Sequence, residues 1–492
     1  MTTNLISLAP DILLYISQFC ELADLFSLSA CCTLLWTLAQ HKSYWLAPLI
    51  AARMRDPIAC TLHDNLRQRS VARLKDIARH TLRLRKNWAS PSPRIYGPVK
   101  HTEIGRSTDF IFQVPGTYYY VLHCRRTGEL IAFDSSHGPS GKTTSKVHLA
   151  RLIADVSPGY NEEGKFSMGL LAADSWDSHQ YQLAIVSLMY DDDGITGMSL
   201  SYQRPLPTGV FDFWAVFLSG EIIGVLQTQF FGGQRTLRLL AYNLKKGNDD
   251  PGVTIDSDIS VQDLAFHGHS GTWVTDNEVY LLMEYISTKM SVLYRFPKSQ
   301  LPNDDNPDCP SHSSFSGSKN TIGTWNLPAA TYFEAKGALT ADPYYWMPCV
   351  SLIYVGDPEA MKIIFWSISD TNDQSQAGTS NSTPTSTLIP YNTTTPGALP
   401  RDNGSWQLSL IPHSGRYILL VLQQTDPEDA SSHVFRLTLV GCDKNTGTCA
   451  SHDLQVPDNV DLSAVSGLSM DDHTGIISLI TNDGKLHIFT YA

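Results

Sequence analysis

The residues whose spacing comes nearest to a chemical motif are Gly141, Lys142 and Thr143, within HGPSGKTTS at 137–145. A Gly-Lys-Thr run that follows a strand ends the phosphate-binding loop of many nucleotide-binding proteins. The predicted strand ELIAFD precedes this run, and KVHLARLIADV after it could form a helix. The motif also requires a glycine where Ser136 stands. A loop inside a β repeat therefore explains the segment better than nucleotide binding does.

Other patterns of catalysis and metal binding are missing from the sequence. It contains no G-x-S-x-G, no H-E-x-x-H and no C-x-x-C, and its sixteen His show no metal spacing. The acidic run 191–194 (DDDG) lacks the alternating Asp and distal Glu of a calcium loop, so we expect a hairpin turn there. We therefore predict no catalytic residue, no metal site and no cofactor, and a protein that is not an enzyme.

The composition favours many short strands over long helices. Of 492 residues, 17% are charged and 10% are aromatic, with 33 Gly and 27 Pro. The net charge of −12 argues against nucleic-acid binding. No membrane span or targeting peptide is expected, because no apolar run approaches about 18 residues. Nine scattered Cys without C-x-x-C indicate reduced thiols in a cytoplasmic or nuclear protein, although Cys442 and Cys449 could face each other across a hairpin.

The elements at the N-terminus are predicted to be three or four short helices within 5–50. Pro10 suits a first helical turn, and Asp11 is favourable near the positive end of a helix. We expect Asp24 to be the N-cap of the next helix. A unit of this size cannot bury two apolar faces by itself. It either packs on the rest of the chain or presents a face to a partner.

This segment, LAPDILLYISQFCELADLFSLSACCTLLWTLAQHKSYW, resembles an F-box. The F-box pattern runs Leu-Pro-x-Glu/Asp-Ile-Leu, a hydrophobic stretch, Asp-Leu, Leu-Ser, Cys and a late Trp. The matching residues are Leu8, Pro10, Asp11, Ile12, Leu13, Ile16, Asp24, Leu25, Leu28, Ser29, Cys32, Leu38 and Trp45. Two departures are Ala9, where the family has its first Pro, and Thr33, where it has a basic residue.

The resemblance implies docking to the Skp-type adaptor of a cullin–RING ubiquitin ligase. The residues it assigns to adaptor binding are Leu8, Pro10, Ile12, Leu13, Ile16, Leu25, Leu28, Leu38 and Trp45. We expect Asp at Leu13 and Ile16 to abolish that binding while the β domain stays folded. The partners would be the Skp-type adaptor, the cullin complex and a target protein that the sequence does not identify.

A basic helix is predicted after the F-box, within 62–88. Its apolar positions share one face: Leu66, Val71, Leu74, Ile77, Ala78 and Leu82. Residues 53–86 hold ten Lys or Arg and three Asp, so their formal charge is +7. The alternatives are a linker helix whose Arg side chains cover the acidic domain that follows, which we favour, and a site for phosphate or nucleic acid. Similar F-box proteins have a comparable linker that ends in Ser-Pro-Ser-Pro.

From residue 95 onward, short apolar runs alternate with turns rich in Gly, Asn, Asp and Pro. Sixteen runs are predicted as strands, among them DFIFQV, ELIAFD, YILLVLQQ and IISLIT. They group into about seven units that begin near 108, 145, 210, 253, 320, 387 and 450, with loops at 303–320 and 370–405. A β-propeller leaves few exposed sheet edges. We expect a strand near 95–106 to complete the last blade. A pair of β-sandwiches is the alternative.

The predicted protein is thus mainly β with a small α N-terminal domain. It comprises an F-box domain (1–50), a basic helical linker (51–94) and a β-propeller-like substrate-recognition domain (95–492) of about seven irregular blades. The leading hypothesis is the substrate-recognition adaptor of a Skp–cullin–F-box ligase. The alternatives are a protein-interaction scaffold outside any ligase and, least favoured, an enzyme built on the propeller.

Overall fold

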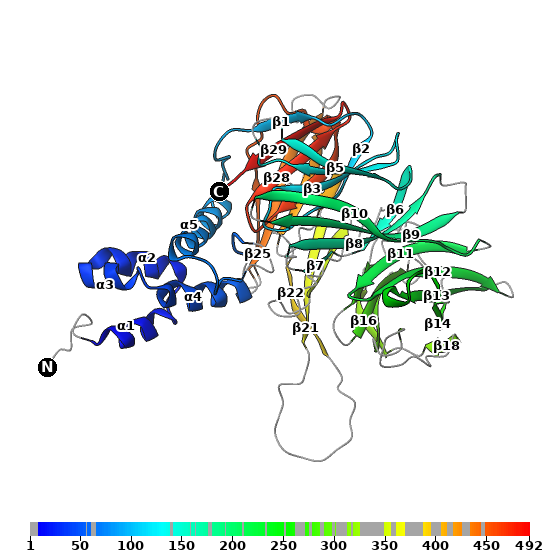
Figure 1. Ribbon diagram of the computed structural model, residues 1–492, viewed down its shortest axis with the longest axis horizontal. Helices are drawn as coiled ribbons and strands as arrows, with labels where there is room; N and C mark the ends of the chain where they lie inside the picture. The colour runs from blue at the N-terminus through cyan, green and yellow to red at the C-terminus, as the bar shows by residue number, and fades with distance from the viewer. Residues whose placement is uncertain are drawn as a thin grey trace, which may run out of the picture.

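The computed structural model places helices in the N-terminal part of the chain and strands in the remainder (Figure 1). It describes residues 8–492 except 56, 61–64, 138–140, 158, 163, 176–179, 192, 209–210, 232–233, 250–251, 261–270, 275–277, 286–289, 298–300, 302–311, 316–317, 325–348, 356–360, 370–386, 395–404, 411–416, 426–432 and 444–447. None of the described helices is both long and apolar enough to span a membrane.

Five α-helices precede the strands: α1 Pro10–Ser17, α2 Leu22–Cys31, α3 Thr33–Leu38, α4 Lys42–Arg55 and α5 Val71–Trp88. Pro10 is the first residue of α1, as its missing N–H and fixed φ predict. The prediction that Asp24 caps α2 is wrong, because the helix begins at Leu22 and Asp24 lies in its first turn. Ser70 caps α5 and accepts a hydrogen bond from the backbone N–H of Arg73 at 3.2 Å.

The first four sheets follow one another along the chain. The first contains β2 Thr108–Gln113, β3 Tyr119–Cys124, β4 Glu129–Asp134 and β5 Lys142–His148. The second contains β6 Leu152–Val156, β7 Tyr160–Glu162, β8 Lys165–Ala173, β9 Tyr181–Asp191 and β10 Gly194–Pro205. The third contains β11 Phe211–Ser219, β12 Ile222–Phe231, β13 Gln234–Asn243, β14 Val253–Ser260 and β18 His312–Phe315. The fourth contains β15 Gly271–Val274, β16 Glu278–Tyr285, β17 Met290–Pro297 and β19 Ser318–Thr324.

Three more sheets complete the described strands. The fifth contains β20 Cys349–Val355, β21 Met361–Ser369 and β22 Thr387–Thr394. The sixth contains β23 Ser405–Leu410, β24 Tyr417–Thr425, β25 His433–Asp443 and β26 Thr448–Asp453. The seventh contains β27 Val465–Asp471, β28 Ile476–Thr481, β29 Lys485–Thr490 and β1 Lys100–Glu103. The pairings are antiparallel, apart from β14 with β18.

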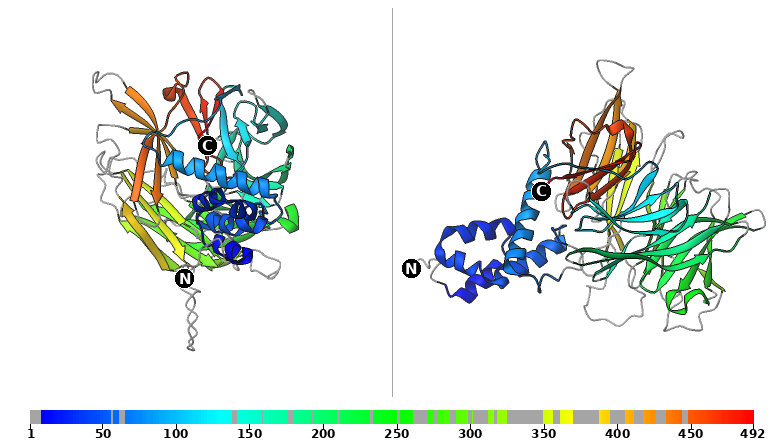
Figure 2. Two further views of the ribbon diagram at one scale, coloured as in Figure 1. Left: turned by 90° about the vertical axis from the view of Figure 1, so that its left-hand side faces the viewer. Right: turned by 45° about the horizontal axis from the view of Figure 1, so that its top comes forward.

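The sheets form a ring that closes as predicted. The first strand, β1, pairs with the last, β29, from Lys100 opposite Ile488 to Glu103 opposite Lys485. Clusters of buried apolar side chains join the first sheet to the second, the second to the third, and the seventh to the first. In the left view of Figure 2, the sheets follow one another around the ring in chain order. The fold is therefore mainly β, a β-propeller-like domain behind a small helical domain.

The described strands form seven sheets, as predicted, but five of the predicted starting points need correction. The positions near 145, 253, 320, 387 and 450 fall on β5, β14, β19, β22 and β26, each the last antiparallel strand of its own sheet. The predicted loops 303–320 and 370–405 contain strands too, namely β18, the start of β19, β22 and the start of β23. Most of their other residues lie outside the described part of the chain. The strands β18 and β19 are polar, and Pro390 interrupts the apolar part of β22, so these three gave no signal. In contrast, β23 corresponds to the predicted strand WQLSLI.

Two local predictions have clear outcomes. The helix that a phosphate-binding loop would need after Lys142 is not there, because Lys142–His148 forms β5 and pairs with β4. This removes the structural context of the Gly-Lys-Thr motif. Cys442 on β25 and Cys449 on β26 lie directly opposite each other across the strand pair, as the predicted hairpin required.

Candidate docking face on the helical domain

The helical domain has a hydrophobic core of its own. Its buried members include Leu13 on α1, Leu25 on α2, Leu38 on α3, Trp45 on α4 and Leu74 on α5. Every member of this cluster comes from residues 8–82, so the first turns of α5 belong to the helical domain. Within the described part of the chain, the helical domain thus has a core made of its own side chains, to which no strand contributes.

A second apolar face on α1 remains uncovered. Ile12 is 45% exposed, Tyr15 60% and Phe19 73%, although all three are large and hydrophobic. They are three and four residues apart, so they follow one side of the helix and the turn after it. The rings of Tyr15 and Phe19 contact each other edge to face, with centroids 5.1 Å apart. On α3, Trp36 is 60% exposed as well.

We call Ile12, Tyr15 and Phe19 the α1 face. Among the described residues, six large hydrophobic side chains are exposed to solvent, and the α1 face and Trp36 supply four of them. The other two, Tyr96 and Val434, are isolated in sequence. Scattered apolar side chains on a surface are ordinary, whereas a group of them on one helix marks an interaction site.

The nine residues assigned to adaptor binding fall into three groups. Pro10 and Ile12 are exposed, and Leu8, Ile16 and Leu28 are partly buried. The remaining four are at most 5% exposed and lie in the core of the helical domain: Leu13, Leu25, Leu38 and Trp45. In this conformation, these four support the exposed face from behind and are not available for contact. Aspartate at Leu13 would therefore disrupt the core, so it is a poor test of docking.

Two of the buried aromatic residues also hold the helices together by hydrogen bonds. The Tyr44 hydroxyl donates to the carbonyl oxygen of Leu25 at 2.9 Å, which ties α4 to α2. Burial raises the pKa of Tyr44 to about 12, so it stays a donor at neutral pH. The Trp45 indole N–H donates to the carbonyl oxygen of Ala39 at 2.8 Å. The late tryptophan of the sequence motif thus has a structural role here.

Tyr15, Phe19 and Trp36 were not among the predicted binding residues. In the sequence, Phe19 shares one helical apolar pattern with Ile12, Leu13 and Ile16, but Tyr15 and Trp36 had no signal of their own. In α1, five consecutive positions from Ile12 to Ile16 are apolar, so the pattern cannot tell which side faces the core. Only the packing of α1 on α4, through Leu13, decides this.

Helix α5 connects the helical domain to the β domain. Its first half contributes Leu74, Ile77 and Ala78 to the helical core. Its second half contributes Leu84 and Trp88 to a different cluster, formed with strands of the sixth and seventh sheets. Figure 1 shows α5 between the other helices and these sheets. One helix is therefore shared by two cores, which fixes the direction in which α1–α3 project.

Polar contacts reinforce this connection along α5. The Asn87 amide donates to the carbonyl oxygens of Arg94 and Tyr491, both at 2.7 Å. His80 Nε2 lies 2.8 Å from the carbonyl oxygen of Thr474. The rings of Trp88 and Tyr417 pack edge to face with centroids 4.7 Å apart. The connection is thus a packed junction with directional contacts.

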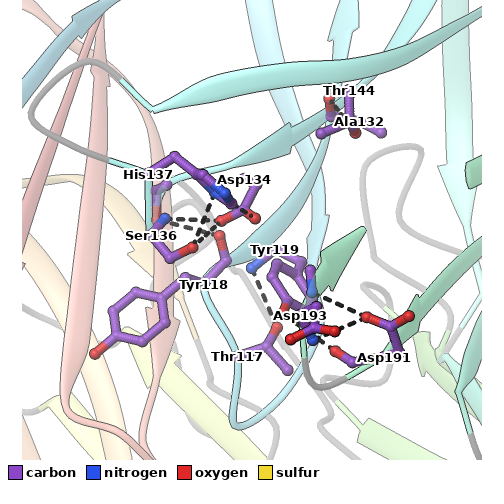
Figure 3. Close-up of polar contacts among 12 residues, drawn as sticks. Thr117, Tyr118, Tyr119, Ala132, Asp134, Ser136, His137, Thr144, Asp191 and Asp193 are labelled. Carbon is purple, nitrogen blue, oxygen red and sulfur yellow. Dashed lines mark hydrogen bonds and ion pairs between the residues drawn. The ribbon is translucent and has the colours of Figure 1, made fainter. Parts of the chain in front are cut away.

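The closest approach to a catalytic arrangement lies on the first sheet, drawn in Figure 3. The Ser136 hydroxyl donates to Asp134 Oδ1 at 2.6 Å. His137 Nδ1 lies 3.0 Å from Asp134 Oδ2 and 3.3 Å from Ser136 Oγ. In a nucleophile relay, the acid and the hydroxyl bind opposite ring nitrogens of the histidine. Here both oxygens approach the same nitrogen, so this group is a turn-stabilising cluster.

The predicted acidic hairpin turn is also visible in Figure 3. Asp191 Oδ1 accepts hydrogen bonds from the backbone N–H groups of Asp193 and Gly194, at 2.9 and 3.1 Å. These bonds close the turn between β9 and β10 and occupy the carboxylate. Across the part of the chain that the structure describes, no three His, Cys, Asp or Glu side chains gather into a metal-binding group.

Comparison with known proteins gives structural neighbours only. No protein-family model matches the chain, and no curated protein does either. One similar structure is the WD40 domain of SCAP from fission yeast, with 11% identity and a TM-score of 0.38 over 80% of this chain and 98% of that one. Another is Sqt1 from Chaetomium thermophilum, with 12% identity and a TM-score of 0.39 over 77% and 81%. The Dos1 propeller has 8% identity and a TM-score of 0.35 over 78% and 77%.

Proposed function

We propose that this chain is the substrate-recognition adaptor of a Skp–cullin–F-box type ubiquitin ligase. The helical domain would dock onto the Skp-type adaptor, and the β domain would bind the target protein. The chain itself would not be catalytic. Ubiquitin transfer would be carried out by other subunits, while this chain holds the target close to them.

The observation that carries the proposal is the α1 face. Its sequence lies within the segment that resembles an F-box, and its side chains stay exposed although the domain has a complete core. Helices α1–α3 also project away from the sheets in Figure 1 and in the right view of Figure 2. A partner can therefore reach them without displacing any part of the β domain.

The geometry on the β domain favours an interaction protein over an enzyme. The Asp134, Ser136 and His137 group lacks the arrangement of a relay. The Gly-Lys-Thr segment continues into a strand, so it lacks the helix N-terminus that binds phosphate. The second candidate is a protein-interaction scaffold outside any ligase, which the ring of sheets would serve equally well.

The test is binding of the full chain to a purified Skp-type adaptor, measured by titration calorimetry and by co-elution with adaptor and cullin. The key variant is Ile12→Ser with Phe19→Ser. Since 45% and 73% of these residues' surfaces are exposed, their burial would contribute about 2–4 kcal/mol. The affinity should then fall by roughly 30- to 1000-fold.

The matched control is Tyr96→Ser with Val434→Ser, which removes two exposed hydrophobic side chains from the β side of the molecule. It should bind the adaptor as the wild type does. All these positions are exposed, so thermal unfolding should change little in either variant. If the wild-type chain does not bind the adaptor, the ligase function is excluded and the scaffold remains. If binding survives in Ile12→Ser with Phe19→Ser, the α1 face is not the docking site.

A further inference from the structure

The exposed side of α5 has an excess of positive charge. Six Lys or Arg and one Asp lie within Val71–Trp88, while the whole chain has a net charge of −12. Four basic residues are exposed: Arg73, Arg79, Arg83 and Lys86. The last three are four and three residues apart and share one side of the helix, and Arg73 lies at the edge of the same solvent-exposed side. We call these four the α5 stripe. At 1.5 Å per residue, it is about 20 Å long.

Most of this charge is not neutralised by the chain itself. Arg79 forms an ion pair with Asp76 at 2.8 Å. For Arg73, Arg83 and Lys86, the described part of the chain offers no carboxylate within ion-pair distance. The expectation that this helix covers an acidic surface of the β domain is therefore not met at these three positions.

The positive potential also acts on a neighbouring group. His80, on the same helix, is partly buried and lies against the carbonyl oxygen of Thr474. Burial lowers the pKa of this imidazole, and the charges of Arg83 and Arg73 lower it further. The stripe is held rigidly, because the opposite side of α5 is anchored in both hydrophobic cores.

We propose that the α5 stripe binds an acidic polypeptide segment of a partner protein. Three uncompensated cations along about 20 Å match the carboxylates of an extended segment of about six residues. This inference is independent of the α1 face, since the two surfaces share no residue. It adds a second interaction surface, in the junction between the helical domain and the ring.

Other polyanions fit the stripe less well. Helices that bind an anionic membrane carry large apolar side chains beside their basic residues. Among the described residues, none of the exposed large hydrophobic side chains lies on α5. A long nucleic acid would extend beyond the helix and meet a chain whose remaining residues are strongly acidic. A short acidic segment contacts the stripe alone and avoids that repulsion.

The test uses the full chain and a fluorescein-labelled peptide of alternating Glu and Ser, followed by fluorescence anisotropy. Arg73→Glu, Arg83→Glu and Lys86→Glu together should weaken peptide binding by about tenfold or more. The three corresponding glutamines should weaken it less. The affinity of the wild type should also fall as salt is added, because the contacts are exposed.

The control is Arg106→Glu, Arg126→Glu and Arg151→Glu, which changes the net charge equally at exposed positions between strands of the β domain. It should alter peptide affinity by no more than about twofold. An equal loss of peptide affinity in the two triple variants would show that binding depends only on net charge, and it would overturn the proposal. So would an absence of binding by the wild type, or tighter binding of a thymidine oligonucleotide of equal charge. Ile12→Ser with Phe19→Ser should keep the peptide affinity, which separates this result from the adaptor test.

Discussion

Replacing Trp88 by Ala should weaken the junction between the helical domain and the ring. Trp88 is 4% exposed and lies in the cluster that α5 shares with the sixth and seventh sheets. Removal of a buried tryptophan costs about 3–5 kcal/mol, from lost burial and the cavity left behind. The lost packing energy belongs to the contact between Trp88 and Tyr417, so α5 should detach from the ring before other parts of the fold open.

Phenylalanine at the same position should cost far less. The indole Nε1 of Trp88 is buried, and the described residues offer it no hydrogen-bond acceptor. A buried donor without a partner costs about 1–3 kcal/mol. Phe removes that donor while it keeps one ring against Tyr417, so the two contributions offset each other. We expect Trp88→Phe to change the free energy of unfolding by less than about 1 kcal/mol.

Urea denaturation followed by circular dichroism would give these free energies, and hydrogen exchange would report on α5 directly. Trp88→Ala should speed amide exchange in Leu84–Trp88 more than in α2. Trp36→Ala is the matched control, because Trp36 is 60% exposed and its loss should cost little. A cost of Trp88→Ala below about 1 kcal/mol, or equal to that of Trp36→Ala, would refute the shared core.

Two further predictions concern the ring. Burial and the neighbouring His101 lower the pKa of His487, so the stability of the fold should fall as the pH drops below about 6.5. In the double variant His101→Thr with His487→Thr, Tm should decrease less steeply as the pH falls. A slope unchanged by that variant would count against the pair. Gly475→Ala should destabilise the chain by at least about 1 kcal/mol more than Gly97→Ala. Both glycines have positive φ, but only at Gly475 would a Cβ meet a buried side chain, 2.4 Å from Leu84 Cδ1; equal losses would exclude this contact.

Much of the ring could be predicted because its inner strands are apolar. ELIAFD and IISLIT became β4 and β28, both almost wholly buried. The polar outer strand β5, KTTSKVH, gave no such signal because it is mostly exposed. KFSMGLLAA was also missed, although it is the buried β8. Gly169 interrupts the apolar run of this strand. A glycine stands there because a Cβ would lie 3.2 Å from Val216 Cγ2.

The candidate docking face could be predicted only in part. The sequence pointed to the first helices, but it could not separate exposed residues from core residues. Leu13 and Ile12 are adjacent and equally hydrophobic, yet one is 4% exposed and the other 45%. The difference arises from long-range packing of α1 on α4. The docking function itself stays a prediction until the adaptor titration is done.

The pairing of β1 with β29 has a consequence for the order of assembly during synthesis. The seventh sheet takes its outer strand from the beginning of the β region and its other strands from residues 465–490. Late residues anchor α5 as well, through the buried Phe489 and the carbonyl of Tyr491, which directly follows β29. On the ribosome, the helical core can form early because its residues are local in sequence. The packing of α5 on the ring can form only after β29 has been synthesised. Closure of the ring and orientation of the helical domain should therefore occur together in a single late step.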